Sequence, residues 1–138
     1  MIFERKKYLD ELIAGRGNGL VKIITGVRRC GKSFLLFDIW HNWLLEHGVT
    51  DSHIIEIQLD DFRNRRLRKP DALLDYIDSK VMDDGNPYYI VLDEVQLVEE
   101  FVEVILSLTH MRNVDVYVSG SNSRFLSSDV VTEFRGRG

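Results

Sequence analysis

The chain carries, at positions 26–33, the segment Gly26-Val27-Arg28-Arg29-Cys30-Gly31-Lys32-Ser33. It matches G-x-x-x-x-G-K-S, the Walker A pattern, in which glycines let the backbone curl and aim its N–H groups at phosphate oxygens. A helix that follows such a loop presents its positive dipole end to the same anion. We therefore expect this loop and the next residue, Phe34, to bind nucleotide phosphates, with Lys32 reaching the β- and γ-phosphates and Ser33 holding Mg²⁺.

The residues around this loop have the periodicity of alternating strands and helices. A short helix is expected before Gly15, a strand at 20–25, and a helix from Phe34 that stops at Gly48. Further strands are expected at 54–59, 88–92 and 114–118, with helices that begin near Pro70 and Phe101. This alternation predicts an α/β fold with a mainly parallel sheet and right-handed crossovers.

A second motif, made of two carboxylates, follows the third expected strand. The apolar run 88–92 ends directly at Asp93 and Glu94. At the carboxyl edge of a parallel sheet, Asp93 would hold the Mg²⁺ shell and Glu94 would lie nearer the γ-phosphate, where it could polarise an attacking water. The alternative is that both acids cap the next helix, whose N-terminus favours negative charge.

Motifs that the sequence lacks limit the choice of nucleotide and of reaction. There is no Asn/Thr-Lys-x-Asp guanine-recognition motif, which favours ATP over GTP. A small-molecule nucleotide kinase would usually carry an arginine-bearing lid after the second motif, whereas this region offers Gln96 and a helix. Our first hypothesis is therefore an Mg²⁺-dependent ATPase that drives conformational change in a larger protein. A nucleotide-sensing interaction module with little turnover comes second, and a nucleotide kinase is a further alternative.

Composition and charge place the chain among ordinary globular proteins. The 138 residues suit one domain, and 44% hydrophobic with 29% charged residues exclude disorder and a membrane bundle. No apolar run approaches the about 20 residues of a spanning helix. The single cysteine, Cys30, cannot form an internal disulfide, which suits a reducing compartment. We expect a cytoplasmic protein with no membrane partner.

The net charge of −4 is unevenly distributed, because residues 1–69 carry 13 basic and 9 acidic side chains and residues 70–138 carry 5 and 13. The stretch Arg63–Lys69 holds five cations in seven residues, so nucleic-acid contact is possible there. Only Phe62 supplies an aromatic ring beside it, which favours a solvated connector instead. Trp40 and Trp43 are expected in the core rather than on a base-stacking surface.

Together these motifs resemble the N-terminal core of prokaryotic AAA-superfamily ATPases of the AAA domain 14 type. The resemblance spans most of the chain and rests on four stretches, GVRRCGKS at 26–33, VLDEVQ at 91–96, SGSNS at 119–123 and FRGRG at 134–138. It implies a P-loop NTPase fold, a three-layer αβα sandwich. It also implies that residues 1–138 form a single ATPase core domain that is a fragment of a longer protein.

The resemblance implies further site residues. The strand after the Walker B strand should end in a polar sensor near the γ-phosphate, a role for Ser119, Ser121 or Asn122, with the last two favoured. Arg137, more than Arg135, would act as an arginine finger, a residue that can also serve the site of a neighbouring subunit. Gln58 falls where related ATPases often carry an asparagine that restrains the catalytic glutamate.

The family strand order, 5-1-4-3-2, implies four core strands here in the order 1-4-3-2, with the fifth strand missing. The strand at 20–25 would then form an open edge. Its unpaired N–H and C=O groups invite another chain, so we expect self-association along this edge.

Overall fold

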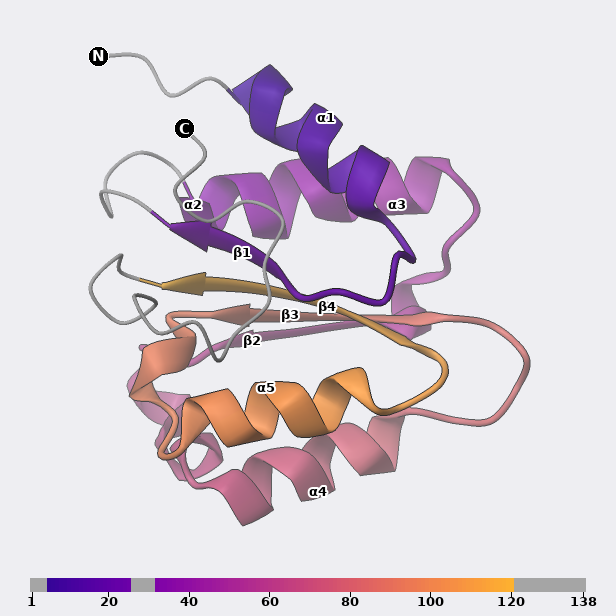
Figure 1. Ribbon diagram of the computed structural model, residues 1–138. Coiled ribbons are helices and arrows are strands. Elements are labelled where there is room, and N and C mark those ends of the chain that lie inside the picture. The colour runs from indigo at the N-terminus through magenta and orange to yellow at the C-terminus, as the bar shows by residue number, and fades with distance from the viewer. Residues whose placement is uncertain (1–4, 26–31, 121–138) are drawn as a thin grey trace.

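The computed structural model describes residues 5–25 and 32–120 of the chain. The described sheet has four parallel strands in the order β1-β4-β3-β2. Their bounds are Lys22–Thr25 (β1), Ile54–Gln58 (β2), Tyr88–Asp93 (β3) and Val114–Gly120 (β4). Helices cover both faces of the sheet (Figure 1). The predicted α/β class, parallel pairing and strand order are therefore confirmed.

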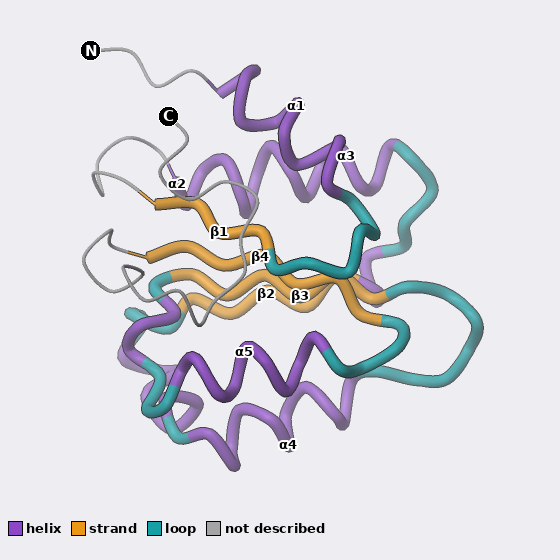
Figure 2. The backbone as a smooth tube through the Cα atoms, in the orientation of Figure 1, coloured by secondary structure: helices purple, strands orange, loops and turns teal. Residues whose placement is uncertain are grey.

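The helices are divided between the two faces (Figures 1 and 2). One face carries α1 (Arg5–Gly15), α2 (Lys32–Phe34) and α3 (His41–Glu46), and the other carries α4 (Pro70–Lys80) and α5 (Phe101–Thr109). Between α2 and α3 the helix continues through a π-helical turn at Leu35–Trp40. Shorter 3-10 turns span Asp51–His53, Phe62–Arg68 and Val95–Leu97.

Each face of the sheet has its own buried apolar cluster. Beneath α1, α2 and α3, the fully buried Trp40 stacks on Trp43 with ring centroids 5.2 Å apart and lies 5.1 Å from the ring of Tyr117. Trp40 therefore lies in the core, as predicted, whereas Trp43 packs against this cluster and is only partly buried. On the other face, Ile77 of α4 and Ile105 of α5 pack against the sheet without exposure to solvent.

All residues of β3 are buried, which explains its continuous apolar run up to Asp93. Because the strands are parallel, β1, β3 and β4 end at the same edge of the sheet, with Thr25, Asp93 and Gly120 as their last residues (Figure 1). The Walker A residues 26–31 lie outside the described residues, as do Ser121, Asn122 and Arg137.

β1 is an edge strand of the described sheet. Self-association along it stays a prediction. Among the helices that the structure describes, none combines the length and the apolar character needed to cross a bilayer.

Candidate nucleotide-binding site

Ser33 and Asp93, the two residues assigned to Mg²⁺, are in direct contact. The Ser33 hydroxyl donates a hydrogen bond to Asp93 Oδ2 at 2.7 Å. Ser33 lies in α2, soon after β1, and Asp93 is the last residue of β3. Since β4 separates β1 from β3 in the sheet, this contact spans the carboxyl end of the intervening strand. The fold thus brings together the serine and the aspartate that the sequence analysis expects to hold Mg²⁺.

Ser119, on β4, connects the two acidic residues of the site. Its hydroxyl donates a hydrogen bond to Asp93 Oδ1 and accepts one from the Glu94 backbone N–H at 3.0 Å. Ser119 is completely buried. It is one of the three sensor candidates, and the two that were favoured over it, Ser121 and Asn122, lie outside the described residues.

Glu94 has an unusual backbone conformation. Its φ of 58° lies in the left-handed region, which costs a non-glycine residue about 1–2 kcal/mol. Two hydrogen bonds hold it there, one from its N–H to Ser119 and one from the Leu97 N–H to its carbonyl oxygen at 3.1 Å. Strained backbone that the surroundings fix in this way is common at functional sites.

Helix capping does not account for the two acids. Glu94 precedes the 3-10 turn Val95–Leu97, but its side chain makes no capping hydrogen bond to that turn. The oxygens of Asp93 accept from Ser33 and Ser119. The capping alternative is therefore wrong for the turn that follows this strand.

The side chain of Glu94 is held by a residue to which the sequence analysis gave no role. Gln96 Nε2 donates a hydrogen bond to Glu94 Oε1 at 2.8 Å. Gln58 pairs with Asp93 in the strand register, but its own side chain is exposed. The sequence signal for Gln96 was its place two residues after Glu94. This spacing indicates a contact between the two side chains only when the left-handed backbone of Glu94 is known.

Burial raises the pKa of Asp93 above its ordinary value. Hydrogen bonds from Ser119 and Ser33 act in the opposite direction, and the charges of Glu94 and Asp60 add to the increase. An ionised carboxylate at 2% exposure is thus costly in the nucleotide-free protein. A divalent cation would relieve this cost.

Asp93→Asn is expected to stabilise the protein at neutral pH when nucleotide and Mg²⁺ are absent. The pKa of Asp93 is higher in the folded protein than its value of 3.8 in the unfolded chain. The protonated side chain therefore favours folding at pH below 3.8, and this stabilising contribution is lost as the pH rises through the folded-state pKa. Asparagine lacks this dependence and can still bond both serines, because the Ser33 hydroxyl can rotate to accept.

We expect a gain of about 1 kcal/mol at pH 7, or about 4 °C in Tm, that shrinks toward pH 3.8. Thermal unfolding of Asp93→Asn and the unaltered protein across this pH range measures the difference. If Asp93→Asn were less stable than the unaltered protein at pH 7, the hydrogen bonds from the two serine hydroxyls to the carboxylate would outweigh the cost of burying its charge.

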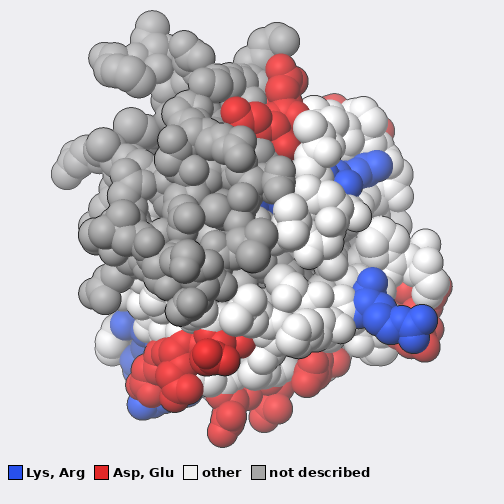
Figure 3. Space-filling view, viewed as in Figure 1, with Lys and Arg blue, Asp and Glu red and all other residues white. Residues whose placement is uncertain are grey.

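The basic stretch Arg63–Lys69 is partly neutralised by nearby carboxylates. Arg63 pairs with Asp61 at 3.0 Å, and Lys69 pairs with Glu99 at 2.6 Å. In Figure 3, acidic side chains gather along the lower part of the described surface, over α4 and α5. Nucleic-acid contact stays a prediction, without support from this charge distribution.

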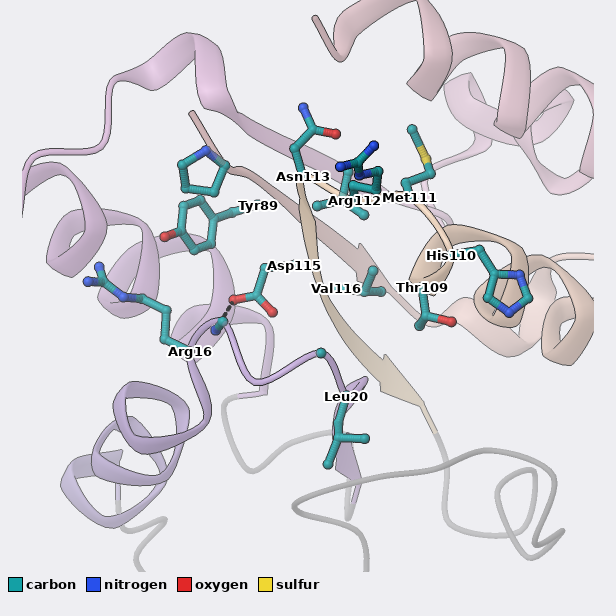
Figure 4. Close-up of a pocket in the computed structure, with 14 residues that line it drawn as sticks. Arg16, Leu20, Tyr89, Thr109, His110, Met111, Arg112, Asn113, Asp115 and Val116 are labelled. Atoms are coloured by element: carbon teal, nitrogen blue, oxygen red, sulfur yellow. Dashed lines mark hydrogen bonds between the residues drawn. The ribbon is translucent and has the colours of Figure 1, made fainter. Parts of the chain in front are cut away.

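A cavity of about 500 Å³ lies at the opposite, amino-terminal edge of the sheet (Figure 4). Arg16, Tyr89, Arg112 and Asp115 are among its lining residues. Asp115 already accepts hydrogen bonds from the Gly17 N–H and from the Tyr117 hydroxyl. This cavity is remote from the Ser33–Asp93 contact and holds none of the residues predicted to bind nucleotide.

A four-stranded parallel sheet of this order, with helices on both faces, has the architecture of an AAA-type P-loop domain. Comparison with protein-family models matches residues 18–138 to a family described as an AAA domain, AAA_14. The chain belongs to this family.

Similar proteins include two curated relatives and one solved structure. The chain is 29% identical over 136 residues to an uncharacterised protein of Haemophilus influenzae, covering 99% of this chain and 34% of that protein. It is 28% identical over 121 residues to an uncharacterised protein of Methanocaldococcus jannaschii, covering 85% and 24%. The structure of C. elegans PCH-2 matches with a TM-score of 0.55 at 19% identity, covering 88% of this chain and 35% of that one. At this identity the likeness shows the fold alone.

Proposed function

We propose that this chain is the ATP-binding core of an Mg²⁺-dependent ATPase, and that hydrolysis drives conformational change in a larger protein. The observation that carries the proposal is the 2.7 Å contact between the Ser33 hydroxyl and the Asp93 carboxylate, with Glu94 next along the chain. Membership of the AAA domain family supports a nucleotide-binding core of this type.

Ser33 and Asp93 fit a hard divalent cation. A hydroxyl and a carboxylate are oxygen ligands of the kind that Mg²⁺ prefers, and they already lie within hydrogen-bond distance of each other. When bound, Mg²⁺ neutralises charge on the β- and γ-phosphates of the nucleotide. Lys32 would bind these phosphates from the start of α2, beside the N–H groups of residues 26–31.

Glu94 would act on the attacking water. Its carboxylate accepts a hydrogen bond from the water and takes up the proton as the new O–P bond forms and the bond from the γ-phosphorus to ADP breaks. ATP and water thus give ADP and inorganic phosphate, and Glu94 then releases the proton to solvent. From the family resemblance, Ser121 or Asn122 would sense the γ-phosphate and Arg137 would neutralise transition-state charge.

The coupling of hydrolysis to conformational change is supported by the architecture of the relatives. The matched region is 34% of the Haemophilus influenzae protein and 24% of the Methanocaldococcus jannaschii protein. Most of each relative therefore lies outside the ATP-binding core. We infer that ATP hydrolysis changes the conformation of such additional regions, which is how P-loop switches commonly act.

Lys32→Ala is expected to weaken ATP binding on the order of 10- to 100-fold, because it removes charge-assisted hydrogen bonds to the phosphates. Isothermal calorimetry with ATP and Mg²⁺ tests this, and GTP should bind less well. Lys80→Ala is the matched control, since Lys80 is an exposed residue at the end of α4. Unchanged affinity in Lys32→Ala would remove the phosphate-cradle model. If no nucleoside triphosphate bound the unaltered protein, the proposed function would fail.

A further inference from the structure

We propose that Gln96 is a positioning residue, which holds the carboxylate of Glu94 in place for the attack of water. This inference rests on the ATPase function proposed above and adds a residue to its site. Gln96 lies at the carboxyl edge of the sheet, in the turn that follows β3, and donates from Nε2 to Glu94 Oε1 at 2.8 Å.

The direction of this hydrogen bond is fixed by chemistry. An ionised carboxylate only accepts hydrogen bonds, whereas an amide has a donating and an accepting end. The opposite orientation of the Gln96 amide would place its oxygen against a carboxylate oxygen of Glu94, which is repulsive. The amide therefore restrains the Glu94 side chain while that side chain is ionised, the form that a general base requires.

The backbone that carries Gln96 is rigid. The 3-10 turn Val95–Leu97 is closed by the bond from the Leu97 N–H to the Glu94 carbonyl and by one from the Val98 N–H to the Val95 carbonyl at 3.0 Å. Val95 and Val98 are buried in the core at 0% and 2% exposure. A short, anchored turn thus presents Gln96 to Glu94, and a functional group held on a fixed backbone is positioned precisely.

The carboxylate of Glu94 is the hydrogen-bond partner that the described residues offer to the amide of Gln96. The Oε1 atom of Gln96 is buried and has no hydrogen-bond partner within the described part of the chain. An apolar side chain of similar length could fill the same space but could not donate to the carboxylate. The bond to Glu94 is therefore the contact that calls for a glutamine at this position.

Ser119 and Gln96 hold different parts of Glu94. The Ser119 hydroxyl accepts from the Glu94 backbone N–H, whereas Gln96 reaches the carboxylate. The family resemblance implies that Gln58 restrains this glutamate. Gln58 instead has an exposed side chain at the end of β2, and its backbone carbonyl accepts from Asn64 Nδ2 at 2.9 Å.

The test is Gln96→Met in the full-length protein, a change that keeps the length of the side chain and removes both polar ends. We expect kcat to fall about 10- to 100-fold, since misplacement of a catalytic group has effects of this size. KM for ATP should change less than about 2-fold, because Gln96 is not proposed to bind nucleotide. Tm should be unchanged or higher, since a buried unpaired acceptor is removed. Lys80→Met, at an exposed position at the end of α4, is the control and should leave kcat unchanged.

A double variant separates positioning from a general effect. If Gln96 acts through Glu94, Gln96→Met should have no further effect on kcat in a Glu94→Gln background. An unchanged kcat in Gln96→Met, or a fall that follows a loss of folded protein, overturns the role of Gln96. The proposed function then survives if Glu94→Gln alone is inactive. If Glu94→Gln turns over like the unaltered protein, Glu94 is not the base and the positioning role of Gln96 fails with it, whereas the proposed function fails only if the unaltered protein does not bind or hydrolyse ATP.

Discussion

Glu94→Gln is expected to lower ATP turnover by about 100- to 10,000-fold, the usual contribution of a general base. Glutamine has nearly the same shape but cannot take up a proton from the attacking water. Its amide oxygen can still accept from Gln96 Nε2, so the local structure should persist. ATP affinity should change little, because we propose that residues 26–33, and not Glu94, bind the phosphates. Phosphate release in the full-length protein measures turnover, and calorimetry measures affinity.

Glu100→Gln is a well-matched control for this experiment. Glu94 and Glu100 are the non-glycine residues with positive φ in the described ranges, at 58° and 53°. Glu100 is exposed and immediately precedes α5, and it is absent from the Ser33–Asp93–Ser119 contacts. Its substitution should leave turnover unchanged. If Glu94→Gln were as fast as the unaltered protein, Glu94 would not be the base. If the unaltered protein bound ATP but its turnover did not exceed the background rate, a nucleotide-sensing module would become the better hypothesis.

Much of the fold could be predicted because its signals are local. β3 is buried on both faces, so its sequence is continuously apolar and ends sharply at Asp93. α4 begins with Pro70, which lacks the N–H that the first turn of a helix leaves unpaired. The strand order is not local, and it followed from the resemblance to a family of known topology.

The finer geometry of the site could not be predicted because it depends on register between strands. In the sheet, Leu92 of β3 pairs with Val118 of β4, which sets Ser119 beside Asp93. Nothing in the sequence of either strand specifies this register, and Ser121 or Asn122 was as plausible a neighbour as Ser119. The contact of Gln96 likewise requires the left-handed backbone of Glu94, which single-sequence patterns do not reveal.

Lys22, at the opposite edge of the sheet, is another residue whose contacts could not be predicted from the sequence. It falls within the short apolar run at 20–25, and its side chain is completely buried on β1. Its ammonium group forms an ion pair with Asp115 of β4, which is 5% exposed, and donates to the Leu20 carbonyl at 2.8 Å. Asp115 also accepts from the Gly17 N–H at 2.9 Å (Figure 4) and from the Tyr117 hydroxyl at 2.6 Å. This cluster fastens the connection between α1 and β1 to β4.

Asp115→Ala is expected to destabilise the protein by about 3–5 kcal/mol, because it leaves the Lys22 ammonium buried without a counter-charge. It also removes the acceptor for the Gly17 N–H and for the Tyr117 hydroxyl. Burial raises the pKa of Tyr117, so this hydroxyl stays a protonated donor that needs a partner. Denaturant unfolding measures the loss. Asp78→Ala, at an exposed position on α4, is the control and should change stability by less than about 0.5 kcal/mol.

Lys22→Met should cost less than Asp115→Ala, because Asp115 keeps its hydrogen bonds from Gly17 and Tyr117 and methionine fills the space of the lysine stem. The decisive comparison is the double variant. Removing Lys22 from Asp115→Ala takes away the uncompensated buried charge, so the double variant should be more stable than Asp115→Ala alone. If the two losses simply add, the ion pair is not what makes Asp115 important. The hydrogen bonds to Gly17 and Tyr117 would then account for its effect.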